Sequence, residues 1–293
     1  MVDLSTHRVD FCQSVRVRVL TLHRSPLTAG AWPEGVSVAA VERCLAVIEA
    51  RDPLTLPADR GALAAAQVVS VACDLDGDVV GVAWRLATPE GAQVDVRVKP
   101  GLRRHGLGTQ LLGEVAAGAA PLWAGCDAAH PRVRRFLLHQ GFALAGVVFH
   151  QRWDGEPRDV PPAFASAHLE TPSDLAMAVS LLRDASAGTW PRPAIGAVEA
   201  ANGRARIAWH GDAPAGVLLA HRESDAWEVD GLAVLPAHRG SGVGRLLAAD
   251  LMRFAAESGV GVTLRVAQDD DAGLSWSQKL GFWTYRTWAM YRR

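Results

Sequence analysis

The chain has 293 residues, of which 49% are apolar and 21% are charged, a composition typical of a soluble globular protein. Its 30 basic and 31 acidic residues leave a formal net charge of −1, which argues against binding to nucleic acid or to a membrane surface through a basic patch. The length favours two domains of ordinary size.

Cysteine and histidine usage points to a reduced compartment and to no metal site. The four cysteines show no metal-type pairing, and the ten histidines have no metal-ligand spacing. The start of the chain lacks a signal-peptide pattern, and the longest apolar stretch, near residues 62–73, is too short to span a bilayer. We therefore expect a cytoplasmic protein with no bound metal.

The first half of the chain predicts strands alternating with helices. A hairpin turn is expected at residues 76–78, between two apolar runs. Strands are expected over residues 15–22, 68–74, 79–86, 92–98, 122–128 and 142–153, and helices over 36–50, 107–117 and 132–140.

The same order of elements recurs in the second half. A proline-containing linker is expected at 154–163, so that the domains would span residues 1–153 and 164–293. Residues 171–174 are a good helix start. Strands are expected over 168–170, 204–210, 215–220, 227–234, 262–267 and 282–291, and helices over 175–185, 243–258 and 271–280.

One motif occurs twice: a Val-x-Pro strand end, then Arg-x-x-Gly-x-Gly, then a helix. Six residues of the first copy align without a gap with six identical residues of the second. Further along, a Gly-Phe pair follows each copy, at Gly141-Phe142 and at Gly281-Phe282. The sets are Val98, Pro100, Arg103, Gly106, Gly108 and Leu111, and Val234, Pro236, Arg239, Gly242, Gly244 and Leu247. Such a repeat indicates two copies of one domain.

The repeated bend has the features of an anion site. Proline ends the strand, and the glycines allow backbone N–H groups to face a ligand without obstruction by side chains. The helix that follows adds its unpaired amides and its dipole, which suit a pyrophosphate. Arg239 adds a positive charge at the mouth of the second bend.

Three interpretations of this bend compete. It could be a purely structural turn. It could belong to a dinucleotide-binding fold, since Gly-Ser-Gly-Val-Gly imitates that fingerprint and Asp269 lies at a suitable distance. However, Arg245 occupies the position of the third glycine, and the preceding hairpins favour antiparallel pairing.

The third interpretation is a resemblance to the GNAT superfamily of acyl-CoA N-acyltransferases, whose hallmark the chain carries at both bends. The resemblance implies an α/β (α+β) fold, with two tandem GNAT domains that each have a mixed, mostly antiparallel sheet flanked by helices. It also implies acetyl-CoA as co-substrate. Tandem members such as mycothiol synthase are similar in layout, but no motif in this chain identifies that substrate.

The resemblance also implies which residues contact CoA. The pantetheine arm is expected between two splayed strands, and one main-chain N–H near Val234 would polarise the thioester carbonyl. In the second copy the expected contacts are Leu232, Ala233, Val234, Arg239, Gly240, Ser241, Gly242, Val243 and Gly244. In the first copy they are Val96, Val98, Arg103, Arg104, Gly106 and Gly108.

The chemistry needs a general base, because a free alkylammonium has a pKa of about 10. The two-residue period of a strand places Glu228 and Asp230 on one face, where GNAT proteins often carry their base. The alternative is a solvated pair of surface carboxylates. In the first copy Asp95 is the weaker candidate, because Arg97 would hold it in an ion pair.

Many GNAT proteins have a tyrosine acid four residues before the Gly-Phe pair, but this chain has Leu137 and Ser277 there. Ser277, Tyr285 or water could serve as the acid instead. The second copy is therefore expected to be the enzyme. The first either binds CoA without turning it over or only holds the second copy in shape.

The sequence thus predicts an acetyl-CoA-dependent N-acetyltransferase that acts on a small-molecule amine. The alternative is a non-catalytic acyl-CoA-binding or regulatory protein. A monomer and a homodimer are both compatible with the sequence.

Overall fold

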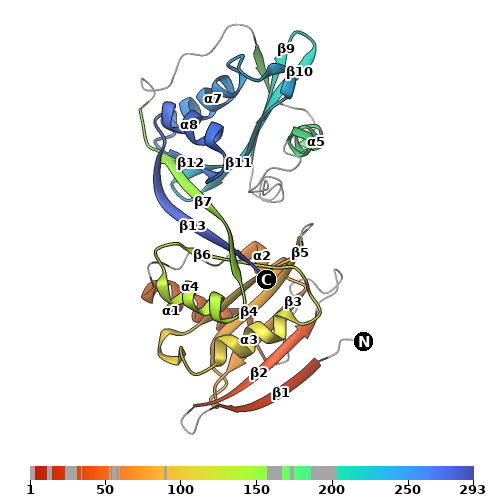
Figure 1. Cartoon of the computed structure of the whole chain (residues 1–293), viewed down its shortest axis with the longest axis vertical. Coiled ribbons are helices and arrows are strands. Elements are labelled where there is room, and N and C mark those ends of the chain that lie inside the picture. The colour runs from red at the N-terminus through yellow and green to blue at the C-terminus, as the bar shows by residue number, and fades with distance from the viewer. Residues whose placement is uncertain are drawn as a thin grey trace. The chain divides into compact units, whose positions relative to one another are not determined.

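The computed structural model describes residues 4–11, 15–23, 32–33, 35–52, 54, 58, 60–88, 91–156, 167–171, 175–185 and 203–293. The chain forms two compact units, shown in Figure 1. Unit 1 comprises Met1–Gly146 and Trp288–Arg293, and unit 2 comprises Val147–Thr287. No helix within the described ranges is long and apolar enough to cross a membrane.

Unit 1 is built on a sheet with the strand order β1-β2-β3-β4-β5-β6-β13. Neighbouring strands run antiparallel except β5 and β6, which are parallel. The elements are β1 (Leu4–Phe11), β2 (Val15–His23), α1 (Val38–Arg51), α2 (Arg60–Ala65), β3 (Val68–Cys73), β4 (Val79–Thr88), β5 (Gly91–Val98), the 3-10 turn η2 (Pro100–Leu102), α3 (Leu107–Ala116), β6 (Leu122–Asp127), α4 (Pro131–His139) and the end of β13 (Trp283–Arg292).

Unit 2 repeats this plan with the strand order β7-β12-β11-β10-β9-β8. Here too a single pair, β11 and β12, is parallel among the described strands. The elements are β7 (Ala143–Trp153), β8 (His168–Glu170), α5 (Leu175–Ala185), β9 (Arg204–His210), β10 (Ala213–Glu223), β11 (Ala226–Val234), the 3-10 turn η4 (Pro236–His238), α7 (Val243–Glu257), β12 (Gly261–Ala267) and α8 (Asp271–Lys279).

Helices pack on both faces of each sheet, so an inner strand such as β3 is buried along its whole length. In unit 1, Val69 and Val71 of β3 pack with α1, whereas Val68 and Ala72 pack with α3. This alternation follows from the two-residue period of a strand. In unit 2, α5 and α7 lie on opposite faces, as Figure 1 shows.

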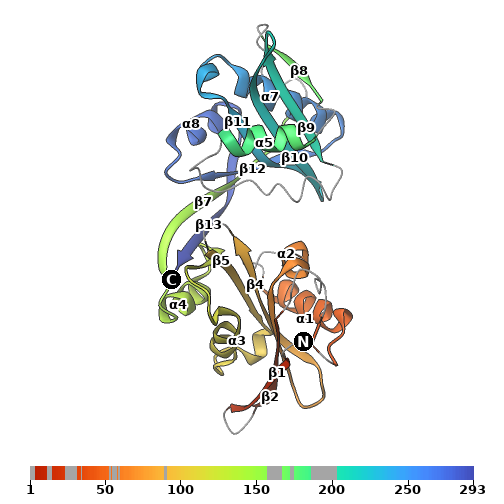
Figure 2. The same ribbon diagram turned by 90° about the vertical axis from the view of Figure 1, so that its right-hand side faces the viewer.

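The last strand of each sequence copy belongs to the other unit. After Phe142, which is buried in the core of unit 1, β7 pairs with β12. After Phe282, which is buried in the core of unit 2, the end of β13 pairs with β6, and Tyr291 packs in the core of unit 1. Figure 2 shows the same strands from a second direction. The compact units therefore divide the chain differently from the sequence halves at 1–153 and 164–293.

The predicted fold class is confirmed, and the predicted strands and helices within the described ranges are present with ends shifted by up to a few residues. Two elements were missed: β1, and the short helix α2 inside an apolar stretch that was considered only as a membrane span. Residues 157–163 of the linker, the helix start at 172–174 and Cys12 lie outside the described residues.

Candidate active site

The two glycine-rich bends have the same backbone conformation. Each follows a strand and a 3-10 turn, and each has two left-handed residues at equivalent positions. The φ angles are 73° at Arg104 and 79° at Gly106 in the first copy, and 78° at Gly240 and 88° at Gly242 in the second. A non-glycine residue in this region costs about 1–2 kcal/mol. The second bend is therefore the less strained of the two.

Helices α3 and α7 begin with amides that are free to bind a ligand. The earliest helical hydrogen bonds run from Gln110 N to Gly106 O at 3.1 Å and from Leu246 N to Gly242 O at 3.0 Å. Neither N-cap glycine has a side chain that could cap its helix. The first three amide N–H groups of each helix thus lack an intrahelical acceptor, and the helix dipole adds partial positive charge there. Both bends suit an anion.

A cavity of about 670 Å³ extends from the second bend into the sheet of unit 2. It is lined by Gly242 and Gly244 at the bend, and by Asp230 and Arg265 at the other end. Strands β11 and β12 pair only as far as Glu228, and beyond that point they diverge. The main chain of β11 along the cavity is therefore not hydrogen-bonded to β12.

Unit 1 has the same arrangement around its own bend. Strands β5 and β6 pair only at Ala92 and Gln93 and then diverge, and a cavity of about 660 Å³ lies along the bend. The backbone prerequisites for an anionic ligand with an extended arm are thus present in both units.

A polar cluster lies where β11 and β12 diverge. It consists of His221, Glu223, Glu228, Asp230 and Arg265. His221 stands opposite Glu228 in the β10–β11 register. Asp230 Oδ2 lies 2.8 Å from His221 Nδ1, and Glu228 Oε1 lies 3.0 Å from Arg265 Nε.

Asp230 occupies a β-bulge. Leu219 pairs with Gly231 and Ala220 pairs with Val229, so Asp230 has no partner on β10. Such an insertion redirects a side chain. As a result both Glu228 and Asp230 lie beside His221 although the register shifts between them.

Burial and mutual contact perturb the carboxyl groups of the cluster. A hydrogen bond with Glu228, together with burial, raises the pKa of Glu223 to about 7. Burial alone would raise the pKa of Glu228, but the charge of Arg265 and the bond with Glu223 lower it. Burial raises the pKa of Asp230 despite its bond with His221. Shifted carboxyl groups beside a cavity are typical of functional sites.

We assign no metal to this cluster. Within the described residues, His221, Glu223 and Glu228 form a group whose possible ligand atoms lie within 4.8 Å of one another. However, Glu228 is already paired with Arg265, and Glu223 and Glu228 share a hydrogen bond. The carboxylate oxygens that a metal ion would need are thus already engaged by a guanidinium and by a shared proton.

The first copy lacks this cluster. The pairing of β4 with β5 begins at Gly81, and the pairing of β10 with β11 begins at Gly216. Counted from these two glycines, Leu86 takes the position of His221, and its partner Gln93 takes the position of Glu228. The β4–β5 register has no bulge. The expected ion pair of Asp95 is confirmed, because Arg97 donates two hydrogen bonds to it at 2.7 Å. No equivalent base is assembled among the residues of unit 1 that the structure describes.

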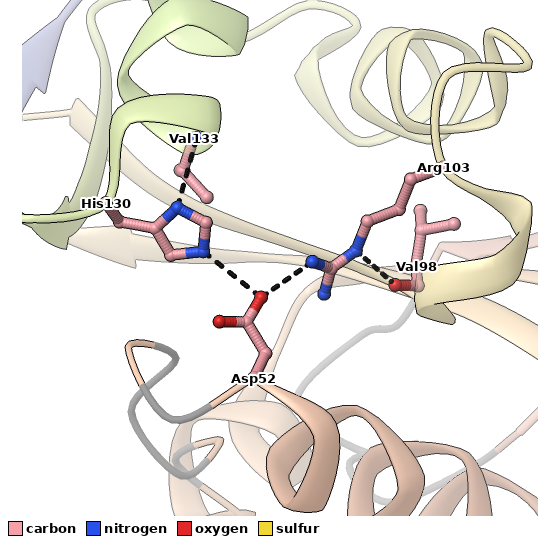
Figure 3. A network of polar contacts seen from close by, with 5 residues as sticks. All are labelled: Asp52, Val98, Arg103, His130 and Val133. Atoms are coloured by element: carbon pink, nitrogen blue, oxygen red, sulfur yellow. Dashed lines mark hydrogen bonds and ion pairs between the residues drawn. The ribbon is translucent and has the colours of Figure 1, made fainter.

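In unit 1 a different network reaches the bend, shown in Figure 3. Asp52 Oδ2 accepts a hydrogen bond from Arg103 at 2.6 Å and lies 3.1 Å from His130 Nε2. Arg103 Nε also donates to the carbonyl of Val98 at 3.1 Å. The Val133 N–H donates to His130 Nδ1, which assigns the imidazole proton to Nε2 and makes that nitrogen a donor to Asp52. Asp52 thereby fixes the motif arginine.

The second bend has no such counter-ion among the described residues. Arg239 Nε donates to the carbonyl of Val234 at 3.3 Å, as its counterpart Arg103 does to Val98. Its guanidinium is otherwise exposed and makes no ion pair with a described residue. The charge of the second bend is therefore available to a ligand.

The model of the Acetyltransferase (GNAT) family matches residues 41–142 and again residues 175–282, well over half of the chain. The chain belongs to the GNAT acetyltransferase family. Each match covers one bend and ends at the phenylalanine of a Gly-Phe pair. No curated protein matches the sequence.

Three solved structures are similar in fold over almost the whole chain. A tandem GNAT protein from the clavulanic acid biosynthesis pathway is 20% identical, with a TM-score of 0.72 over 95% of this chain and 98% of that one. A GCN5-related N-acetyltransferase from Sphaerobacter thermophilus is 16% identical, with a TM-score of 0.65 over 94% and 95%. A putative acetyltransferase from Pyrococcus horikoshii is 12% identical, with a TM-score of 0.59 over 98% and 92%. These likenesses concern the fold alone.

The structure places the CoA contacts expected from the GNAT motif along the two cavities. In unit 2 they all line the cavity except Ser241, whose hydroxyl donates to the carbonyl of His238 at 2.5 Å. In unit 1 all six line the cavity: Val96, Val98, Arg103, Arg104, Gly106 and Gly108. Their contact with CoA itself stays a prediction.

The candidate acids differ in exposure. Ser277 is fully buried, and its hydroxyl donates to the Leu274 carbonyl at 3.0 Å, so its proton is not directed at the cavity. Tyr285 is 44% exposed and stacks edge-on with His150. Burial and the nearby charge of Glu228 raise the pKa of Tyr285, which keeps its phenol protonated.

Reasoning from the sequence missed His221, Glu223 and Arg265 in unit 2, and Asp52 and His130 in unit 1. His221 and Glu223 alternate along one strand in the same way as Glu228 and Asp230, which was the available signal. Nothing local connects Asp52 with a bend 51 residues later in the chain.

Proposed function

We propose that the chain is an acetyl-CoA-dependent N-acetyltransferase whose chemistry takes place in unit 2. The observation that carries this is one continuous cavity, which joins the open anion site at Gly242 to Asp230 and Arg265 where the strands diverge. The free amides at the start of α7 and the charge of Arg239 would hold a pyrophosphate. The unpaired main chain of β11 would hold the pantetheine arm.

The polar cluster supports a small amine as the acceptor. Asp230 and Arg265 line the cavity, and Glu228 and Glu223 lie beside Arg265 with no second arginine in the cluster. Such a surface favours a cationic group and disfavours an anionic one. Family membership supports an acyltransferase in general, and the choice of an amine rests on this charge.

We further propose that unit 1 binds acyl-CoA without turning it over. It has the bend, the diverging strands and the cavity, but Leu86 and Gln93 replace the polar pair of unit 2. From the sequence we also propose that the protein is cytoplasmic and that it acts without nucleic acid or a membrane. We propose that it is a monomer or a homodimer.

Calorimetry with acetyl-CoA tests the binding sites, and the chain provides its own matched control. Gly242→Asp places a carboxylate at the second anion site, and Gly106→Asp does the same at the first. Like charges about 4 Å apart repel by about 4 kcal/mol at an effective dielectric of about 20, which weakens binding roughly 1,000-fold.

Release of free thiol from acetyl-CoA with a panel of primary amines then tests the chemistry. Gly242→Asp is expected to abolish acetylation, whereas Gly106→Asp is expected to leave it unchanged. If acetyl-CoA binds tightly but no amine of a broad panel causes thiol release, the non-catalytic alternative is favoured. Loss of activity in Gly106→Asp alone would assign the chemistry to unit 1.

A further inference from the structure

The polar cluster and the anion site of unit 2 lie on opposite faces of its sheet. Val217 and Leu219 of β10 pack with α5, whereas Leu218 and Ala220 pack with α7. By the two-residue period, His221 lies on the α5 face. The bend and α7 belong to the other face, so an arm that passes between β11 and β12 would present its end to His221.

The imidazole of His221 is held by a buried carboxylate. The Asp230 side chain has no exposed surface, and its Oδ2 lies 2.8 Å from His221 Nδ1. Since a carboxylate oxygen accepts, Nδ1 carries the proton and Nε2 keeps a lone pair. The His221 side chain is 14% exposed and can therefore be reached by a small molecule.

This arrangement changes the roles expected from the sequence. Asp230 is buried and already engaged, and Glu228 is engaged by Arg265 and Glu223, so neither is free to accept a proton from an acceptor. A histidine, with an ordinary pKa of about 6.5, is matched to proton transfer near neutral pH. Asp230 Oδ1 has no hydrogen-bond partner either, but it is fully buried, so among the described groups of the cluster His221 Nε2 is the one that combines an unused lone pair with an exposed position.

We propose that His221 is the general base of acetyl transfer, with Asp230 as its positioning residue. The amine lone pair attacks the thioester carbonyl carbon, and the N–H proton passes to His221 Nε2 as the C–N bond forms. The C–S bond then breaks, and its electron pair leaves with sulfur. The thiolate takes up a proton, which His221 returns. The balanced products are an amide and CoA thiol. This assignment rests on the proposed function.

Titratable groups on the strands around the imidazole interact with it or with its carboxyl neighbours. Glu223 on β10 and Glu228 on β11 interact with His221 itself, whereas Arg265 on β12, His150 on β7 and Tyr285 on β13 interact with Glu228. Unit 1 has Leu86 at the position of His221, so the proposal also explains why only unit 2 carries the chemistry.

The test compares His221→Asn with Leu86→Asn, its counterpart in unit 1. Asparagine can still donate to Asp230 from the Nδ1 position, but it has no Nε2. With the amine panel, kcat/KM of His221→Asn is expected to fall at least 100-fold, since general bases typically contribute 10²–10⁴-fold. Its acetyl-CoA Kd is expected to stay within about threefold, and Leu86→Asn is expected to match the wild type.

The pH profile separates a base from a merely structural residue. The acid limb of kcat/KM is expected to be lost in His221→Asn. In Asp230→Asn kcat/KM is expected to fall while the acetyl-CoA Kd stays within about threefold, because the imidazole loses the carboxylate that orients it. Wild-type kcat/KM with an intact acid limb in His221→Asn would overturn the proposal while leaving the acetyltransferase function standing.

A measurement that needs no activity checks the geometry. Nitrogen-15 NMR of the histidine side chains is expected to show the Nδ1–H tautomer for His221 at pH 7.5, and a change of tautomer in Asp230→Asn. A proton on Nε2 in the wild type would overturn the assignment. Failure of the wild type to acetylate any amine, with this tautomer present, would instead count against the proposed function.

Discussion

Replacing Asp52 with asparagine removes the charge that holds Arg103 at the first bend. The contact is 2.6 Å long, and the two side chains are 11% and 28% exposed. Unit charges about 4 Å apart attract by about 4 kcal/mol at an effective dielectric of about 20. Desolvation and the partial exposure of Arg103 reduce the net effect, so we expect the free energy of unfolding to fall by roughly 2 kcal/mol at pH 7.

The effect of this substitution depends on pH in a defined direction. Burial alone would raise the pKa of Asp52, but the hydrogen bonds from Arg103 and His130 and the charge of Arg103 lower it below its ordinary value. A lowered pKa in the folded state gives stability that is present above the ordinary carboxyl pKa, about 3.9, and is lost as the pH falls through the folded value. The wild type and Asp52→Asn are therefore expected to converge in acid.

Urea unfolding at a series of pH values from 7 down to 3 measures this difference, and hydrogen exchange of α1 and α4 locates it in unit 1. Arg103→Gln is expected to destabilise the chain by a similar amount, because it leaves the Asp52 charge buried. Its counterpart Arg239→Gln, which breaks no ion pair with a described residue, is expected to change stability by less than about 0.5 kcal/mol. A difference between wild type and Asp52→Asn that stays constant from pH 7 to pH 3 would refute the reasoning, as would equal effects of the two arginine substitutions.

Three further predictions concern unit 2. Since the pKa of Glu223 is raised from 4.5 to about 7, the wild type is expected to lose stability as the pH rises from 5 to 8, and Glu223→Gln is expected to lose less. Urea unfolding measures both; the same pH dependence of the unfolding free energy in the two proteins would contradict this. Gly231→Ala would place a methyl group against the buried Leu182 of α5 and is expected to cost about 1–3 kcal/mol, with recovery when Leu182→Ala is added; thermal unfolding of the single and double variants measures it. Ser277→Ala is expected to leave kcat within about twofold, because the hydroxyl serves the Leu274 carbonyl; a tenfold fall would restore Ser277 as the acid.

The sequence alone could predict whatever depends on neighbouring residues. Proline ends the strand, glycine permits the left-handed positions at Gly240 and Gly242, and a helix follows, so the bend is encoded within a dozen residues. The duplication of the bend predicted two domains of one fold, and hydrophobic periodicity predicted the strands and helices of both. The ion pair of Asp95 with Arg97 could likewise be expected from their spacing.

Tertiary structure decided what depends on register and on distant contacts. A single extra residue at Asp230 shifts the pairing of β10 with β11, and this brings Asp230 to His221 rather than leaving it as a free base. The contact of Asp52 with Arg103 requires α1 to end beside a bend that lies far along the chain.

The boundary of each compact unit was also decided by tertiary structure. Both last strands have the apolar alternation of a sheet strand, and that pattern is satisfied by any partner of the right spacing. Pairing of β7 with β12 and of β13 with β6 therefore cannot be read from either strand. The local sequence determines the glycine-rich bend, whereas the register and the pairing of strands determine which side chains lie beside it.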